Sequence, residues 1–179
     1  MTWFEGLPEG DNDWDRLASA HPEPLSAMAG VYAAAWVDCD PVLLELARLR
    51  IATLLDNSGE LGHRSGPAQV AGLTEDKIAA LAAWPSSPLF APVERACVAL
   101  AEQFALDASG VTDQQVADVA AALGDVACYA YVEGVSALET FQRACLALGI
   151  RTSPGVDQLV AAGTAYNSAV EVAAKEATA

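Results

Sequence analysis

The sequence predicts an all-α protein. Apolar residues recur at helical spacing along most of the chain, and capping residues or prolines stand at the starts of these segments. No stretch alternates apolar and polar residues as a half-buried strand does. With 179 residues, of which 53% are hydrophobic, the chain can bury the core of one domain. We divide it into an arm (1–24), a helical domain (25–150) and a C-terminal helix segment (151–179) that packs on this domain or on a partner subunit.

The first 55 residues contain two predicted helices. Residues 1–24 mix Gly, Pro, Asp and Glu in irregular order, which is typical of an extended or loosely packed arm. A helix is predicted near 25–37. Asp40 then supplies a side-chain cap, and Pro41 opens a second helix that runs to about residue 55. This helix is apolar almost all round, so we expect neighbours to bury it on several sides.

Five more helices are predicted after residue 55. The turn-rich stretch DNSGELGHRSG, residues 56–66, comes first and can hold one short helical turn. Thr74 and Thr112 are capping residues, and Gly124 is a stop signal. Gly134 falls inside the longest helix, where it allows close packing of a neighbour. These signals place helices near 74–84, 91–106, 112–123, 125–148 and 156–176.

Composition excludes several classes of partner. The net charge is −15 and no basic patch is visible, which argues against binding of nucleic acid. No apolar run approaches the roughly 20 residues of a membrane span, so no membrane partner is expected. The acidic N-terminus lacks the basic region of a secretory signal, so we expect a cytoplasmic protein. Without a glycine-rich phosphate loop or metal-ligand spacing, we expect no cofactor and no metal.

The four cysteines form no Cys-x-x-C pair. Cys97, Cys128 and Cys145 lie in apolar helical stripes, where a free cysteine is usually a small core residue. Cys39 stands in the polar stretch VDCDP and is expected to be the most exposed of the four. The sequence therefore predicts buried thiols at three positions.

Three blocks of sequence, in this order and spacing, carry a family resemblance. They are the ELARLRIA helix, the connector AGLTEDKIAALAAWPSSPLF and the ERACVALAEQF helix. Over about residues 25–150 the chain resembles the alkylhydroperoxidase D-like and carboxymuconolactone decarboxylase superfamily. The resemblance implies a bundle of about six to seven helices. It also implies a homo-oligomer, either a dimer or dimers assembled into trimers or hexamers.

The chain departs from the peroxidase branch of this superfamily at its reactive positions. That branch has a helical glutamate, a Cys-x-x-C pair twelve residues later and a histidine four residues after the second cysteine. Glu45 fits the glutamate, whereas Asn57 and Glu60 stand at the cysteine positions and Arg64 at the histidine position. Since peroxide reduction needs a thiolate, the resemblance implies the scaffold without the redox mechanism.

The decarboxylase branch suggests acid–base chemistry on a small, carboxylated substrate. Glu45 and Glu60 are candidates for a base and an acid, because neighbouring carboxylates can split their pKa values. His63 is a candidate proton shuttle, although it lies one residue short of the family histidine. Arg64 is a candidate clamp for a substrate carboxylate.

Glu45 also has a structural interpretation. Arg48 follows it by three residues on the same helix, so the two side chains can pair on one face. We expect Glu45 to be buried at the base of a small pocket, within reach of Arg64 or Arg48, with Asn57 and Arg48 as candidate substrate-binding residues. We favour a non-redox acid–base enzyme, and two alternatives stay open: a catalytically silent binding or scaffold protein, and a divergent thiol-dependent peroxidase.

Overall fold

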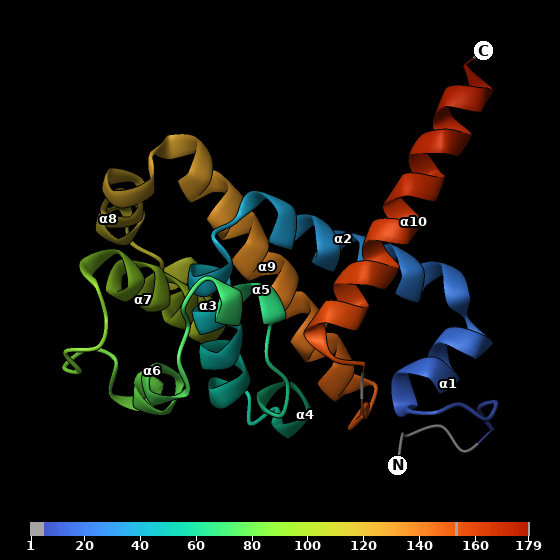
Figure 1. The fold of residues 1–179 in the computed structure, drawn as a ribbon, viewed down its shortest axis with the longest axis horizontal. Coiled ribbons are helices and arrows are strands. Elements are labelled where there is room, and N and C mark those ends of the chain that lie inside the picture. The colour runs from blue at the N-terminus through green and yellow to red at the C-terminus, as the bar shows by residue number, and fades with distance from the viewer. Residues whose placement is uncertain (1–5, 153, 179) are drawn as a thin grey trace.

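The computed structural model describes residues 6–152 and 154–178, and its helices enclose α3 (Figure 1). No strand is assigned within these residues, which confirms the all-α prediction. There are more helical segments than the six to seven expected, because short helices fill the connections. The α-helices are α1 (Asp13–Ala20), α2 (Pro22–Asp38), α3 (Pro41–Leu54), α4 (Ser58–Leu61), α5 (Gly66–Val70), α6 (Glu75–Ala79), α7 (Pro92–Leu106), α8 (Asp113–Leu123), α9 (Asp125–Ala147) and α10 (Val156–Ala177). Two 3₁₀ segments, η1 (Ala80–Ala83) and η2 (Ala108–Gly110), complete them.

Helix α3 is the centre of the fold. It packs against α7 and α9, and α4, α5 and η1 lie along its remaining sides. Leu44 and Ile51 face one hydrophobic cluster, while Leu46 and Leu49 face a second one, and all four are 0–1% exposed. Burying such a side chain contributes about 1.5–3 kcal/mol. The expectation that neighbours bury this helix on several sides is therefore confirmed.

Local signals fixed the helix boundaries well. The Asp40 carboxylate accepts hydrogen bonds from the backbone N–H groups of Val42 and Leu43 at 2.9 and 3.1 Å, as its predicted capping role requires. Each of the seven predicted spans overlaps a helix, with ends that differ by a few residues. The predicted helix near 74–84 is divided into α6 and η1, because the chain tightens into a 3₁₀ turn ahead of Pro85.

The N-terminal arm was predicted wrongly in part. Residues 13–20 form α1, which begins where the Asn12 side chain accepts a hydrogen bond from Asp15 N at 2.9 Å. Trp14 is buried, and its ring centroid lies 5.4 Å from that of Phe141 on α9. A capped turn and one apolar anchor thus order a segment whose composition suggested a loose arm. The first five residues of the predicted arm lie outside the described part of the chain.

Two glycines allow close helix contacts. A Cβ at Gly134 on α9 would lie 2.9 Å from Leu44 of α3, which explains the predicted close packing at this position. A Cβ at Gly163 on α10 would lie only 1.9 Å from the carbonyl oxygen of Ala29 on α2. Helix α10 therefore crosses α2 of the same chain in direct backbone contact. Beyond this crossing, the C-terminal part of α10 projects away from the other helices (Figure 1).

Candidate functional site

A buried ion pair lies at the position singled out by the sequence. Arg48 Nε donates to Glu45 Oε2 at 2.7 Å, and Arg48 Nη2 donates to Glu45 Oε1 at 2.8 Å. Both residues are 0% exposed. The pairing follows from their three-residue spacing on α3, which places them on one helix face. The expectation that Glu45 is buried and paired with Arg48 is confirmed.

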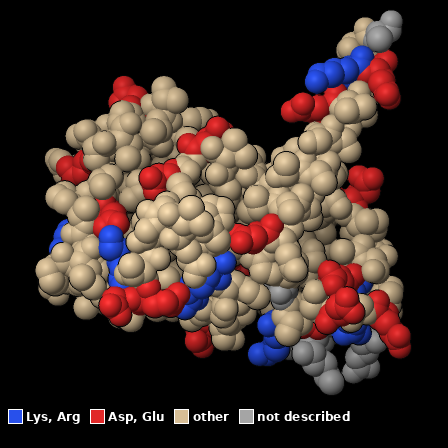
Figure 2. Space-filling model, in the orientation of Figure 1, with Lys and Arg blue, Asp and Glu red and all other residues tan. Residues whose placement is uncertain are grey.

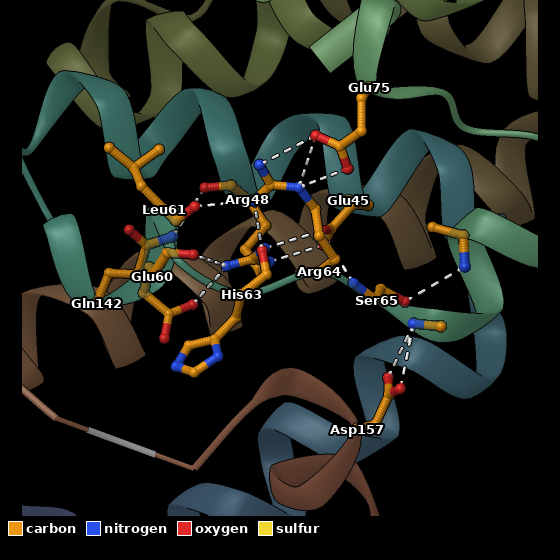
Figure 3. A network of polar contacts seen from close by, with 12 residues as sticks. Glu45, Arg48, Glu60, Leu61, His63, Arg64, Ser65, Glu75, Gln142 and Asp157 are labelled. Atoms are coloured by element: carbon orange, nitrogen blue, oxygen red, sulfur yellow. Dashed lines mark hydrogen bonds and ion pairs between the residues drawn. The ribbon is translucent and has the colours of Figure 1, made fainter. Parts of the chain in front are cut away.

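The turn after α3 folds back onto the same arginine. Arg48 Nη1 donates to Glu60 Oε2 at 2.9 Å and to the Glu60 carbonyl oxygen at 2.8 Å. Arg48 Nη2 also donates to the His63 carbonyl oxygen at 2.9 Å. A guanidinium has five N–H donors, and these contacts together with the two to Glu45 account for all of them. We call Glu45, Arg48 and Glu60 the ion cluster (Figure 3).

Further backbone and side-chain contacts fix the ion cluster in place. Ser65 N donates to Glu45 Oε1 at 3.1 Å, and Gln142 Nε2 on α9 donates to the Arg48 carbonyl oxygen at 3.0 Å. Burial disfavours the charged guanidinium, but the hydrogen bonds and the negative charge of Glu45 outweigh it and raise the pKa of Arg48. Arg48 is thus a permanent cation held between two carboxylates.

Asn57 and His63 border the ion cluster in different ways. The Asn57 side chain is 4% exposed and accepts a hydrogen bond from Glu60 N at 3.3 Å, so it caps α4. His63 takes part through its carbonyl oxygen. Its imidazole is turned away from Arg48, toward Gly155 at the start of α10 (Figure 3). This direction is set by the path of the chain, because His63 lies in the non-helical stretch between α4 and α5.

Arg64 does not reach Glu45, and that part of the expectation is wrong. Its Nε donates to Glu75 Oε1 at 3.0 Å on the protein surface. Its Nη1 donates to the carbonyl oxygens of Leu61 and His63 at 2.8 Å each. Because Arg48 already binds Glu45 from within the same helix, Arg64 is left on the outer side of the turn (Figure 3).

Sequence reasoning missed two residues of the site. Ser65 precedes Gly66 and Pro67, a pattern that favours a helix start, and its side chain does cap α5. Gln142 gave only a weak signal, a polar residue on the core face of a long helix. It is 0% exposed and lies 94 positions from its partner Arg48. Only the packing of α9 against α3 brings these two residues together.

Several of the surface hollows lie along α2 and α9. Three adjoining hollows have volumes of about 250, 630 and 530 Å³. They are lined mainly by small and apolar side chains such as Val31 and Ala137, with Asp38 and Glu133 among them. None of the three is lined by a residue of the ion cluster. The pocket that we expected above Glu45 is therefore not among them.

The protein environment raises the pKa values of the cysteine thiols. Burial, reinforced by nearby acidic charges, raises the pKa of Cys39 to about 11. Burial also raises the pKa values of Cys97 and Cys145 to about 12 each. Cys39 is half-buried and its Sγ donates to the Ala130 carbonyl oxygen at 3.3 Å, so it is the most exposed of the four cysteines, as expected. The three other cysteines are buried, as predicted.

Charges of both signs mix on the surface. On the face shown in Figure 2, Lys and Arg lie in small groups beside Asp and Glu, around a broad uncharged area. In the described part of the chain, no three His, Cys, Asp or Glu side chains are grouped so that they could hold a metal ion. No helix among the described residues is both long enough and apolar enough to cross a membrane.

Comparison with known proteins supports the resemblance drawn from the sequence. The carboxymuconolactone decarboxylase family matches residues 22–103, which contain α2, α3 and most of α7. Residues 22–103 belong to this family. The superfamily membership predicted from Glu45 and the blocks that follow it is therefore confirmed. No curated protein matches the sequence.

A solved structure extends the likeness beyond the family region. It is a protein of unknown function from Agrobacterium tumefaciens, described as a candidate antioxidant defence protein AhpD. The two chains are 18% identical with a TM-score of 0.69, and the match covers 77% of this chain and 96% of that chain. At this level of identity the likeness concerns the fold alone. It places this carboxymuconolactone decarboxylase-like chain on an alkylhydroperoxidase D-like scaffold.

Proposed function

We propose that this chain is a non-redox member of its superfamily that acts as a binding or scaffold protein, with the ion cluster as a structural element. The observation that carries the proposal is the saturation of Arg48, whose five N–H donors are all bound to protein oxygens. A general base must come within about 2.6–3.2 Å of a substrate proton. Glu45 is 0% exposed and each of its oxygens already accepts a hydrogen bond.

The face formed by α2 and α9 is the best candidate for the binding surface. Val31, Val126 and Tyr129 are 61%, 85% and 67% exposed there, beside the three hollows. Exposed apolar side chains that gather on one face mark contact surfaces in soluble proteins. The superfamily resemblance favours a second copy of the chain as the occupant, so we propose a homo-oligomer that assembles through this face.

An acid–base enzyme acting on a small carboxylated substrate is the second candidate. One observation favours it: the His63 imidazole points toward the start of α10 and not into the core. His63 and Glu60 could then act together if the neighbouring segment moved aside. In this version Glu45 and Arg48 position Glu60, and Arg64 and Asn57 stand at the rim.

Replacement of Glu45 by Gln separates the two candidates. If the ion cluster is structural, E45Q should lower the free energy of unfolding by about 2–4 kcal/mol, because half of a buried bidentate pair is lost. That corresponds to a drop in Tm of about 4–16 °C. Incubation of the wild type with small carboxylated lactones, followed by NMR, should show no turnover. E176Q, at an exposed site on α10, is the matched control and should leave Tm unchanged.

Turnover by the wild type that disappears in folded E45Q would overturn the structural proposal and establish the acid–base alternative. Unchanged Tm in E45Q would also contradict it. Circular dichroism and light scattering on the variant show whether fold and assembly are retained, so that a loss of activity is not confused with a loss of structure.

A further inference from the structure

The C-terminal part of α10 is exposed on all sides. Every residue from 168 to 178 is exposed, and Figure 1 and Figure 2 show this end of the helix standing clear of the other helices. We call residues 168–177 the distal segment. It is about 15 Å long, given a rise of about 1.5 Å per residue. A helical stretch this short gains little stability of its own in water, so a packing partner would stabilise it.

The apolar stripe with which α10 packs on α2 continues along the distal segment. Val156, Leu159 and Gly163 are the buried residues of this stripe. The same alternation of three-residue and four-residue steps continues through Tyr166, Val170, Ala173 and Ala177. Residues at this spacing share one face of a helix. The face that α10 uses against α2 therefore extends beyond α2, where Val170 is 48% exposed.

The three hollows along α2 and α9 form one groove that is long enough to receive the distal segment. Glu133 lines all three, so the hollows are continuous with one another. They follow α9 from Val126 to Thr140, a distance of about 21 Å along the helix. Several of the lining side chains are small, namely Ala34, Ala35, Ala130 and Ala137. Small side chains let two helices approach closely, as Gly163 of α10 does with Ala29 of α2.

The distal segment and the groove together have the size of a standard interface. On each copy of the chain they comprise roughly 30 residues, and a standard protein–protein interface has about 20–30 residues a side. In a two-fold dimer each copy gives its distal segment and receives that of its partner, so the same contact occurs twice and the assembly is closed. Both exposed apolar surfaces would then be covered by one arrangement.

We propose that the distal segment of each copy lies in the α2–α9 groove of a second copy. Helix α10 then packs on its own domain through its first half and on a partner subunit through its second half. The proposal rests on the function proposed above, which places a second copy on the α2–α9 face. It goes further by naming the segment that fills the groove, a segment that lies outside the region matched by the family.

The variants V170D and V172D compare two sides of the distal segment in the full-length chain. Val170 lies on the stripe and Val172 lies off it, and they are 48% and 54% exposed. Residues two apart do not share a helix face, while both variants place the same residue in the same exposed helix. V170D should raise the dissociation constant of the oligomer by about 30-fold or more, because it would bury an unpaired carboxylate. V172D should keep the wild-type mass in multi-angle light scattering over the same dilution series.

Hydrogen exchange identifies the surface that the distal segment contacts. V31D alters the groove on a different helix, since Val31 of α2 lines two of the hollows. At a concentration at which the wild type is assembled, the amides of residues 168–177 should exchange about tenfold faster in V31D, because the distal segment loses its packing partner. V70D on α5, where Val70 is 91% exposed, is the control and should leave these amides unchanged.

Each contrary result has a distinct meaning. Equal dissociation by V170D and V172D would reflect loss of helix rather than loss of the stripe, and would overturn the proposal. Dissociation by V31D but not by V170D would overturn it while leaving assembly through the α2–α9 face standing. Unchanged exchange at residues 168–177 in dissociated V31D would show that the distal segment lies elsewhere, for example against the α10 of another copy. A monomeric wild type would contradict both this proposal and the homo-oligomer proposed above.

Discussion

Arg48 binds both carboxylate oxygens of Glu45 from three residues further along the same helix, at 2.7 and 2.8 Å. Both oxygens of Glu45, the glutamate at the family position, therefore accept hydrogen bonds from the protein itself. The same guanidinium reaches Glu60 at 2.9 Å, which ties the turn after α3 back to that helix. The Arg48 guanidinium thus connects the two segments of the chain in which the peroxidase branch has its reactive groups.

Replacement of Arg48 by Met should strongly destabilise the protein. Two buried carboxylates would lose their counter-charge, which costs about 3–5 kcal/mol. We expect Tm to fall by about 6–20 °C in differential scanning calorimetry. R50M on the same helix is the control, because the Arg50–Glu102 pair is partly exposed and should contribute about 0–1 kcal/mol. Similar decreases in Tm in R48M and R50M would contradict the expectation that the buried ion cluster stabilises the fold more than the partly exposed pair does.

The protein should fail to reduce organic hydroperoxides with a dithiol reductant. The raised pKa values, about 11 for Cys39 and about 12 for Cys97 and Cys145, leave few thiolates at neutral pH. At pH 7.5 the ionised fraction is on the order of 1 in 1,000 or less. A coupled peroxidase assay checks this expectation. Turnover that disappears in C39S, or in a variant of any other native cysteine, would favour the thiol-dependent alternative.

Stability should fall at alkaline pH. Cys97 and Cys145 ionise near pH 9 when unfolded but have pKa values of about 12 in the fold, mainly because of burial. The part of the free energy of unfolding that depends on these thiols being neutral is therefore fully present below pH 9. It is lost as the pH rises from about 9 to 12. Each group contributes a slope of about 1.4 kcal/mol per pH unit in this window. Urea unfolding at pH 8 to 11 measures the slope, and C97A should make it shallower. An identical slope in C97A would contradict the assignment.

Introduction of a charge on the α2–α9 face should dissociate the proposed oligomer. V31D places a carboxylate among exposed apolar side chains that we expect a second copy to cover. Multi-angle light scattering should show an oligomer for the wild type and a smaller species for V31D. V70D on α5, where Val70 is 91% exposed, is the control and should keep the wild-type mass. A wild-type monomer at micromolar concentration, independent of dilution, would contradict the proposal.

The sequence by itself determined the class of fold, most helix spans and one half of the ion cluster. These features depend on residues close together in the chain: Asp40 caps the helix that follows it, and Glu45 meets Arg48 across one turn. Such contacts follow from helical geometry, which has a fixed period. The family position of Glu45 could be recognised for the same reason, since it rests on spacing along one segment.

Only the tertiary structure decided which residues complete the site. The partners of Arg48 include Glu60 and Gln142, which lie 12 and 94 positions away, and Asp157 meets Gly66 across 91 positions. The directions of Arg64 and His63 likewise depended on how the turn folds onto α3. Local patterns set helices but not the path of the connections, and a buried arginine binds whichever oxygens the folded chain brings within hydrogen-bond distance. The sequence therefore specified a charged helix face, and the packing of α4, α9 and α10 made that face an enclosed cluster.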